Sequence, residues 1–443
     1  MGTLIETGMI DLPADFGSAE TQRALTSMAN AMQASSILTI ANQIRERKAA
    51  GEPVANLTVG DFAPELFPIP AGLRTRLIEA IERGDTNYPP PQGMPELRRA
   101  IQGYVARTQG MNLPLDAIAV VGGGRPTLYA TYRLLVEPGE LVVFPVPSWN
   151  NHNYRDVCGV RVHEVACRAE DAFQPTAALL KPHLSKARLF VLNTPQNPSG
   201  GVMPREEVAA FGELLVEENA RREQAGEKPL YLLFDQIYQA ITFDDHVHYS
   251  PVQLVPECAP YVVHSDGLSK NFCATGLRCG WVYGPPAFVR KLSALLTHVG
   301  AWAPKPVQVA AAGWLDDVEA VDAWSQDLNA RAQHSLEVLA DGISALQADG
   351  LPVEMIRPQG AIYLSVRFDL VGRKTPAGEV LADNEAVRSY LLEEAGFAIV
   401  PFAAFGADEA DAEGWSRASV GAASADELRE RMPHLRRAIE ALA

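Results

Sequence analysis

The amino-acid sequence predicts an α/β fold: a large domain with a mostly parallel seven-stranded sheet between helices, and a smaller α+β domain formed by both chain ends. Two features of the chain predict it. Between residues 117 and 283, short apolar runs alternate with helical stretches, which is the pattern of successive βαβ units. Beyond residue 350, further short apolar runs follow a long helical region and precede a closing amphipathic helix. Because the large domain interrupts the small one in sequence, we expect both chain ends to belong to the small domain.

The elements can be placed in order along the chain. The first thirty or so residues are polar and weakly patterned, which suggests an arm that packs on another surface. A helical pattern follows from Met32 to Arg47, and a short strand, Ala55–Val59, ends at Gly60. A further helix is expected from Pro95 to Gln109, because Gly110 is a stop signal. The strands of the large sheet are expected at Ala117–Val121, Leu141–Phe144, Val160–Val165, Leu189–Leu192, Leu230–Phe234, Tyr261–His264 and Cys279–Tyr283.

Helices are expected between these strands, at Pro126–Val136 and Arg205–Gln224, and the charged stretch Arg221–Lys228 is expected to be a surface loop. A long helical region is expected from Pro306 to about Leu346, with few breaks. The small domain should hold strands and a last helix at Val353–Arg357, Ala361–Arg367, Ala398–Val400, Ser416–Val420 and Ala425–Leu442. The chain then divides into residues 1–65, an arm and part of the small domain; 66–315, the large domain; and 316–443, the small C-terminal domain.

Composition and charge exclude several classes of protein. Hydrophobic residues make up 47% of the 443 residues, which suits a globular chain and not a disordered one. Acidic residues outnumber basic ones by 54 to 38, and the net charge of −16 disfavours a nucleic-acid partner. No apolar run reaches the roughly 18 residues of a membrane span, and no signal peptide begins the chain. Five cysteines without a CxxC pair suggest buried free thiols, so we expect a cytoplasmic protein.

Polar and glycine-rich segments follow five of the predicted strands. One of them, residues 267–280, reads GLSKNFCATGLRCG, with Lys270 among small residues and Arg278 eight positions later. A lone lysine in a loop is usually a solvated surface charge, so the lysine alone identifies no site. The other four segments are VGGGRPT at 121–127, PSWNNH at 147–152, NTPQNPSG at 193–200 and FDQIY at 234–238.

Together these segments resemble those of fold-type I aminotransferases of the aspartate aminotransferase kind (class I/II), and the resemblance runs from about Met32 to the C-terminus. It implies an enzyme, a transaminase, in which Lys270 forms a Schiff base with pyridoxal 5′-phosphate (PLP). It also implies that Lys270 acts as the general base that breaks the Cα–H bond of an amino acid. A lysine near fixed cations and away from bulk water has a lowered pKa, which suits both tasks.

The resemblance assigns several residues to the cofactor phosphate. Ser269 and Arg278 would hold it, the arginine by paired hydrogen bonds. Gly124 and Arg125 would add backbone N–H groups at a helix start, where the helix dipole favours an anion. A glycine triplet alone more often marks a turn. Gly267 stands where many relatives have a second phosphate-binding serine, so that contact is expected to be missing.

The resemblance also assigns residues to the cofactor ring. Asp235 would lie against the pyridine nitrogen and keep it protonated, so that the ring accepts electrons. Asn197 and Tyr238 would hydrogen-bond the ring hydroxyl, Trp149 would stack on the ring, and His152 would support Asp235. Each has an ordinary structural alternative: a helix cap for the aspartate, core packing for the tryptophan and a satisfied structural histidine.

Two further segments concern the substrate and the quaternary structure. Trp415–Val420 is similar to the family's late strand, in which Arg417 would grip the substrate α-carboxylate while the backbone of Gly60 approaches it. Tyr88 lies in a Y-x-x-x-x-G-x-x-x-L-R segment whose tyrosine, in relatives, reaches the phosphate of the neighbouring subunit. A homodimer with shared active sites is therefore expected.

The substrates are less sharply defined. The resemblance implies an L-amino acid donor, aspartate or another acidic amino acid, and a 2-oxo acid acceptor such as 2-oxoglutarate, with Asn197 and Arg125 near the substrate. Arg125 has two open interpretations: it binds a distal carboxylate, or it reinforces the phosphate charge.

Two alternative functions stay open. A PLP-dependent lyase or decarboxylase would use the same cofactor residues. A non-catalytic effector-binding domain of a transcription regulator would need a DNA-binding module, and no basic helix-turn-helix pattern precedes the fold. His246 and His248 could suggest a metal, but they lack a third ligand and a solvated hairpin is the expectation, so no metal is predicted.

Overall fold

The computed structural model describes residues 14–32, 36–149, 151–408 and 410–443. The chain forms two compact units, Met1–Ala34 and Ser35–Ala443. The first unit contains the short helices α1 (Ser18–Ala24) and α2 (Ser27–Ala31). The backbone of α2 begins at a capping residue, since the Thr26 hydroxyl accepts a hydrogen bond from Ala29 N. The predicted arm therefore contains helices, and its first thirteen residues lie outside the described part of the chain.

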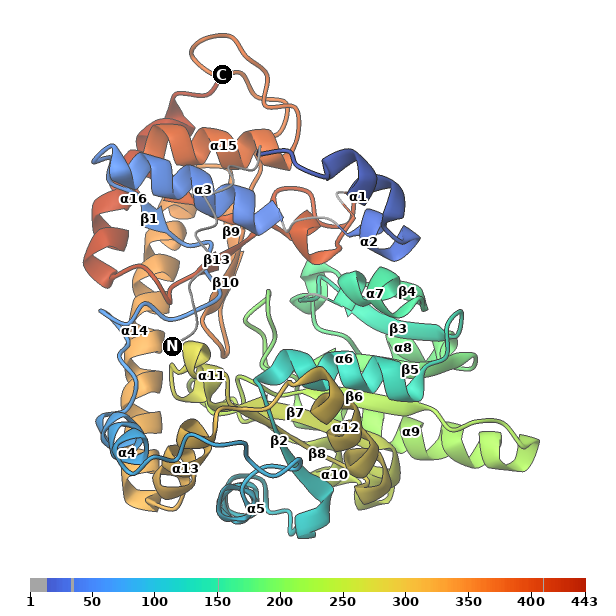
Figure 1. Ribbon diagram of the computed structural model, residues 1–443. Coiled ribbons are helices and arrows are strands. Elements are labelled where there is room, and N and C mark those ends of the chain that lie inside the picture. The colour runs from blue at the N-terminus through green and yellow to red at the C-terminus, as the bar shows by residue number, and fades with distance from the viewer. Residues whose placement is uncertain (1–13, 33–35, 150, 409) are drawn as a thin grey trace. The chain divides into compact units, whose positions relative to one another are not determined.

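A seven-stranded sheet forms the centre of the second unit, as the sequence predicted. Its order is β2-β8-β7-β6-β5-β3-β4, and every pairing is parallel except that β8 runs antiparallel to both of its neighbours. Figure 1 shows these strands with helices packed around them. The strands are β2 (Ile118–Val121), β3 (Leu141–Val146), β4 (Arg161–Ala166), β5 (Ala187–Asn193), β6 (Tyr231–Asp235), β7 (Val262–Gly267) and β8 (Gly280–Tyr283).

Both faces of the central strands of this sheet are covered, which explains why these strands are mostly apolar, whereas the edge strand β4 is largely exposed. Alternate residues of one strand enter different hydrophobic clusters. On β6, Leu233 packs with α6 (Gly124–Leu135) and α12 (Pro286–Val299), whereas Leu232 packs with α9 (Arg205–Ala225) on the other face. A sheet buried in this way presents only its strand ends to a ligand.

A second sheet belongs to the smaller domain. Four antiparallel strands lie in the order β12-β13-β10-β9, and a separate two-stranded pair joins β1 to β11. The β1–β11 pair aligns Ala55 with Phe397, so an early segment of the chain is paired with a late one, as predicted. These strands are β1 (Ala55–Asn56), β9 (Val353–Ile356), β10 (Tyr363–Phe368), β11 (Phe397–Ala398), β12 (Val400–Pro401) and β13 (Trp415–Ser419).

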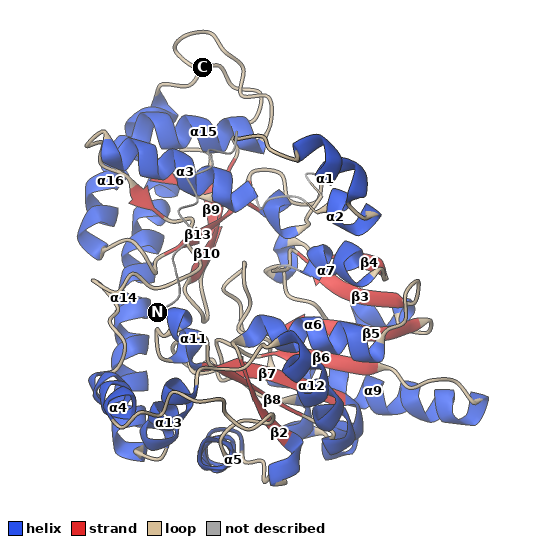
Figure 2. Ribbon diagram, viewed as in Figure 1, coloured by secondary structure: helices blue, strands red, loops and turns tan. Residues whose placement is uncertain are grey.

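Helices account for most of the remaining chain (Figure 2). Helix α5 occupies the predicted range, Pro95–Gln109, and ends because Gly110 adopts the left-handed conformation, with φ 66°. The last helix begins with a capping box between Ser424 and Glu427. The helices not yet given bounds are α3 (Ser36–Ala49), α4 (Ala71–Glu82), α7 (Tyr154–Cys158), α8 (Ala177–Leu180), α10 (Pro251–Leu254), α11 (Leu268–Asn271), α13 (Lys305–Leu315), α14 (Val318–Ala348), α15 (Asn384–Ala395) and α16 (Ala425–Glu440).

Some predicted elements were wrong in their limits. The pattern from Met32 to Arg47 is not one helix, because Met32 is an extended residue that ends α2. The long helical region expected from Pro306, by contrast, is confirmed: it consists of α13 and α14, with one short break between Leu315 and Val318. The expected strand Ala398–Val400 is split between β11 and β12.

The predicted loop at Arg221–Lys228 was also wrong, because α9 continues to Ala225. Glu218 accepts hydrogen bonds from Arg221 and from Arg222, three and four residues later on the same helix, and the pairs hold the last turns. Arg222 is buried and also donates to the Leu184 carbonyl. The charged stretch up to Ala225 is thus the end of α9, and its two arginines form ion pairs with Glu218.

The five cysteines are free and buried, as expected from their spacing. Within the described residues, no helix is long and apolar enough to cross a membrane.

Candidate active site

The predicted site segments meet at one edge of the large sheet. Strands β5, β6 and β7 are parallel, and near their carboxyl ends the register aligns Asn193 with Asp235 and Asp235 with Ser265. Strand β2 ends at the same edge and leads into α6, which begins at Gly124. Parallel strands place the residues after their carboxyl ends side by side, which is where an open α/β sheet binds ligands.

Lys270 is the buried amine of this site. It lies on the four-residue helix α11, directly after β7, and is 9% exposed. Its Nζ donates a hydrogen bond to the Gly60 carbonyl at 2.6 Å and lies 3.4 Å from Asp61 Oδ1. Burial lowers the pKa of Lys270; Asp61 opposes this shift and the Arg417 charge adds to it. The lysine therefore gives up its proton more readily than an exposed one.

Arg417 lies in β13 and is 2% exposed. Its two terminal nitrogens donate to Asn197 Oδ1 at 3.0 Å and to the Thr58 carbonyl at 2.6 Å. Its guanidinium also lies over the rings of Tyr363 and Phe405, 4.8 and 4.7 Å from their centroids. The hydrogen-bond acceptors found for it in the described chain are neutral, and its Nε is buried without a partner. Burial lowers the pKa of this arginine, and a carboxylate would neutralise its charge.

Gly60 lies against this arginine. A Cβ atom at this position would lie 2.9 Å from Tyr363 Oη and 3.3 Å from Arg417 Nη1. A side chain here would therefore collide with the tyrosine and crowd the guanidinium. The structure thus explains why glycine stands at position 60, although the early strand β1 already ends at Asn56 and not, as predicted, at Val59.

Asp235 carries a carboxylate that is 9% exposed. The hydrogen bond found for it comes from Ile237 N, at 3.2 Å to Oδ1. Burial raises the pKa of Asp235 to about 7. A carboxylate buried in this way is stabilised when it binds a proton or pairs with a cation.

Tyr238, three residues after Asp235, is buried, and its hydroxyl contacts the hydroxyl of Tyr363. Their rings pack edge to face, with centroids 5.5 Å apart. Tyr363 belongs to β10 of the small sheet, and Asp235 is the last residue of β6 in the large sheet. The site is therefore built from both sheets.

Arg278 lies beside the start of α6. Its guanidinium donates to the Thr275 carbonyl at 2.7 Å and to the Gly122 carbonyl at 3.1 Å. A Cβ atom on Gly123 would collide with this guanidinium, so the close approach requires glycine. The predicted phosphate residues Arg278 and Gly124 are thus brought to the same place.

Ser269 is buried next to Lys270, and Gly267 has no room for a side chain. A Cβ atom on Gly267 would lie 2.7 Å from Gly280 Cα and 3.0 Å from the Cys279 carbonyl oxygen. The strands β7 and β8 approach too closely for a side chain there. A serine hydroxyl cannot occupy this position without moving the sheet.

Arg125 and Trp149 interact with each other. The exposed Arg125 guanidinium lies over the half-buried Trp149 ring, 4.9 Å from its centroid, in a cation–π contact. His152 has a buried Nδ1 without a partner among the described residues, and burial lowers its pKa. The structure gives no hydrogen bond between His152 and Asp235 in the described chain, and Asn150 of this segment lies outside it.

Tyr88 does not join this group of side chains. It is 80% exposed, and its ring lies 5.2 Å from that of Trp302. A large aromatic side chain that is exposed to solvent and packs against a second aromatic ring is typical of an interface residue.

Sequence reasoning missed Asp61, Tyr363 and Thr275. Asp61 directly follows Gly60 at a strand end, which is a signal that the sequence does contain. Tyr363 lies within the predicted strand Ala361–Arg367, where a tyrosine suggests only core packing. The contact between the Thr275 hydroxyl and the Asp61 carboxylate joins residues 214 positions apart and has no local signal.

The histidines near residue 247 also differ from expectation. His246 is exposed, but His248 packs against the Phe234 ring, with centroids 5.8 Å apart, and burial lowers its pKa to about 3. His248 is therefore not part of a solvated hairpin.

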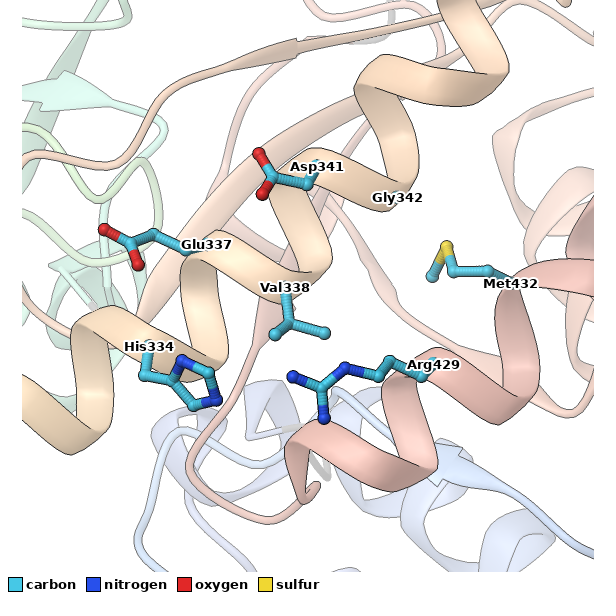
Figure 3. Close-up of a pocket in the computed structure, with 7 residues that line it drawn as sticks. All are labelled: His334, Glu337, Val338, Asp341, Gly342, Arg429 and Met432. Carbon is cyan, nitrogen blue, oxygen red and sulfur yellow. The ribbon is translucent and has the colours of Figure 1, made fainter.

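A hollow of about 530 Å³ lies between α14 and α16, and Figure 3 shows the residues that line it. It is lined by His334, Glu337, Asp341 and, from the facing helix, Arg429 and Met432, together with Val338 and Gly342. None of these residues belongs to the segments that form the candidate site.

The fold and the arrangement of these residues define a class of protein: an α/β enzyme with a buried lysine at the ends of its strands. Comparison with known proteins gives the family. The family model for aminotransferase class I and II matches residues 52–435. The chain belongs to this family and is an enzyme, an aminotransferase.

Individual relatives agree. The chain is 29% identical over 377 residues to an aspartate/prephenate aminotransferase of Cereibacter sphaeroides, covering 84% of this chain and 89% of that one. An aspartate aminotransferase of Rhizobium meliloti is 29% identical over 378 residues, covering 84% and 87%.

Solved structures agree as well. A crystal structure of aspartate aminotransferase from Rhizobium meliloti is similar with a TM-score of 0.84 and 26% identity, covering 95% of this chain and 99% of that one. Aspartate aminotransferase from Thermus thermophilus with maleate has a TM-score of 0.80 and 26% identity, covering 94% and 99%.

Proposed function

We propose that the protein is a PLP-dependent aminotransferase that carries its cofactor on Lys270. It would transfer the amino group of an acidic L-amino acid, such as aspartate, to a 2-oxo acid such as 2-oxoglutarate. One observation carries this proposal: a buried lysine amine with a lowered pKa shares its site with a buried arginine for which the described chain supplies no carboxylate.

The residues fit PLP. Asp235, with its raised pKa, lacks a cationic partner that a protonated pyridine nitrogen would supply. Arg278 and the amino end of α6 offer positive charge to a phosphate. Ser269 and Arg125 would add donors to it, and Asn197 and Tyr238 would reach the ring hydroxyl. Trp149 would stack on the ring, and His152 would support Asp235.

The cofactor, when bound, supplies an electron-accepting ring conjugated to the amino acid. The chain itself supplies the proton transfer. Lys270 Nζ, as a free base, would take the Cα proton of the donor and would later give a proton to C4′ of the cofactor. The Gly60 carbonyl, 2.6 Å from Nζ, would accept a hydrogen bond from the protonated form.

The substrate would be held by Arg417. A guanidinium binds a carboxylate through paired hydrogen bonds. Asn197 keeps Arg417 in place through its side-chain oxygen, and the missing side chain at Gly60 leaves room beside the guanidinium. These contacts would fix the Cα–H bond in front of Lys270.

The acidic character of the substrate rests on Arg125 and on the relatives. Arg125 is exposed and stacks on Trp149, so its charge remains available to a second carboxylate. One similar solved structure contains maleate, a dicarboxylic acid. Replacing Arg125 with alanine is expected to raise KM for aspartate about tenfold or more, and to change KM for an aromatic donor little, because a lost charged hydrogen bond costs roughly 1.5–3 kcal/mol. An equal rise in KM for both donors would show that Arg125 acts only at the phosphate.

We further propose a cytoplasmic homodimer in which Tyr88 reaches the phosphate site of the neighbouring subunit. The exposure of Tyr88 supports this arrangement. The proposed domain limits remain residues 1–65, 66–315 and 316–443.

The decisive experiment is a panel of amino donors with the holoenzyme. Addition of aspartate alone should convert the cofactor absorbance band to that of the aminated form, and 2-oxoglutarate should restore the original band. A lyase or decarboxylase would instead release ammonia or carbon dioxide from the donor in the absence of a 2-oxo acid, and that result would replace the proposed reaction.

A further inference from the structure

Lys270 has a charged neighbour outside the segments that the sequence singled out. Asp61 follows Gly60, and its Oδ1 lies 3.4 Å from Lys270 Nζ, within ion-pair distance. The Gly60 carbonyl accepts a hydrogen bond from the same nitrogen at 2.6 Å. Two successive residues of one loop therefore hold the amine, one through the backbone and one through a charge.

The Asp61 carboxylate is itself held in place. The same oxygen accepts hydrogen bonds from Phe62 N, at 2.8 Å, and from the Thr275 hydroxyl. Thr275 belongs to the segment that follows Lys270, and its carbonyl accepts a hydrogen bond from Arg278 at 2.7 Å. Asp61 is thus tied to the segment that carries both the lysine and the proposed phosphate arginine.

The charges around the amine give Asp61 its effect. Lys270 is buried, and both its burial and the Arg417 charge disfavour the ammonium form. Asp61 acts in the opposite direction through its charge and its hydrogen bond. Among the described residues, it is the carboxylate found within ion-pair distance of Lys270. Its side chain is 41% exposed, so solvent screens part of this attraction.

We propose that Asp61 is a positioning residue for Lys270. It holds the protonated amine beside the Gly60 carbonyl whenever the lysine is not bound to the cofactor, and so governs how readily the amine gives up its proton. This inference rests on the proposed function, since it takes Lys270 as the amine that is released and then moves a proton.

The test measures the amine directly. Full-length protein without cofactor is acetylated at a series of pH values, and the modification of Lys270 is followed by peptide mass spectrometry. The variant Asp61→Asn should lower the midpoint of this pH profile by about one pH unit, the low end of the effect of a nearby opposite charge. Asp61→Glu, which restores the carboxylate, should recover most of that change. The matched control Glu65→Gln removes an exposed carboxylate four residues away and should leave the midpoint unchanged.

A second variant tests the support of the carboxylate. Thr275→Val removes the hydroxyl that contacts Asp61 and should move the midpoint in the same direction by a smaller amount. An unchanged or raised midpoint in Asp61→Asn would overturn the inference, even if Thr275→Val changed the profile.

Borohydride reduction of the wild-type holoenzyme separates this inference from the proposed function. If Lys270 carries the reduced cofactor and Asp61→Asn does not lower the midpoint, only the role of Asp61 is wrong. If the wild-type lysine carries no cofactor, the proposed function is wrong and the role of Asp61 falls with it.

Discussion

At the scale of single residues, Asp235 carries a carboxyl group whose charged form is disfavoured by its burial. The fold buries this carboxylate at the end of β6 and gives it one backbone donor, so that its pKa rises to about 7. A buried acid without a cation is costly for a protein to keep. A bound ligand with a protonated ring nitrogen would relieve that cost.

This property predicts a pH dependence of stability. Between about pH 4 and pH 7 the folded state of the cofactor-free protein keeps a proton on Asp235 that the unfolded state has lost. The free energy of unfolding should therefore fall as the pH rises through this range, by roughly 4 kcal/mol at most. Asp235→Asn stays neutral, so urea unfolding of this variant should lack that part of the decline. The exposed-site variant Asp341→Asn should behave like the wild type, and an identical profile in Asp235→Asn would show that the carboxylate is not strained.

The residues of the site differ in how well the sequence revealed them. Lys270, Asn197 and Arg417 lie in short segments that follow strands or form a recognisable late strand, and the structure brings these segments together. Tyr363 and Thr275 act through contacts with residues more than 100 positions away, which no local pattern records. Such residues can be identified only from the three-dimensional structure, in which the two sheets are assembled.

At the scale of elements, the strands were predictable because each is a short apolar run bounded by polar residues or glycine. The helix limits were less so. The charged end of α9 suggested a loop, but its arginines pair with Glu218 within the helix. The break between α13 and α14 carries two aspartates, and Asp317 forms an ion pair with Arg76 of α4, a contact that the sequence does not show.

The approach of β7 to β8 gives a test at this scale. Gly267→Ser would restore the serine found in many related enzymes, but its Cβ would lie 2.7 Å from Gly280 Cα. We expect the variant to lose about 1–3 kcal/mol of stability, as overpacked sites do, and to bind PLP more weakly. Gly276→Ser, in the same segment and with no atom within 4 Å of the added Cβ, is the matched control. Tighter PLP binding by Gly267→Ser, without loss of melting temperature, would show that the strands can separate.

At the scale of the whole molecule, the chain combines two sheets that each supply part of one site. Strands β5, β6 and β7 end beside the residues proposed to hold the cofactor, while β10 and β13 supply Tyr363 and Arg417. A movement of one sheet relative to the other would therefore move Arg417 relative to Lys270. The remaining proposed contact, from Tyr88, would come from a second copy of the chain.

The shared site predicts complementation between two inactive variants. Tyr88→Ala and Lys270→Ala should each lose most activity as homodimers. After mixing under conditions that exchange subunits, one site of each heterodimer combines an intact Lys270 with an intact Tyr88, so about a quarter of the wild-type activity should return. A mixture that stays as inactive as its components would place Tyr88 within its own subunit's site or outside any site.

The most direct test of the central claim is the chemical identity of the residue that carries the cofactor. Holoenzyme is reduced with borohydride, digested, and its peptides are analysed by mass spectrometry. We expect the reduced cofactor on Lys270 alone, and no labelled peptide from Lys270→Ala treated in the same way. Label on another lysine, or none on a wild-type protein incubated with PLP, would contradict the account.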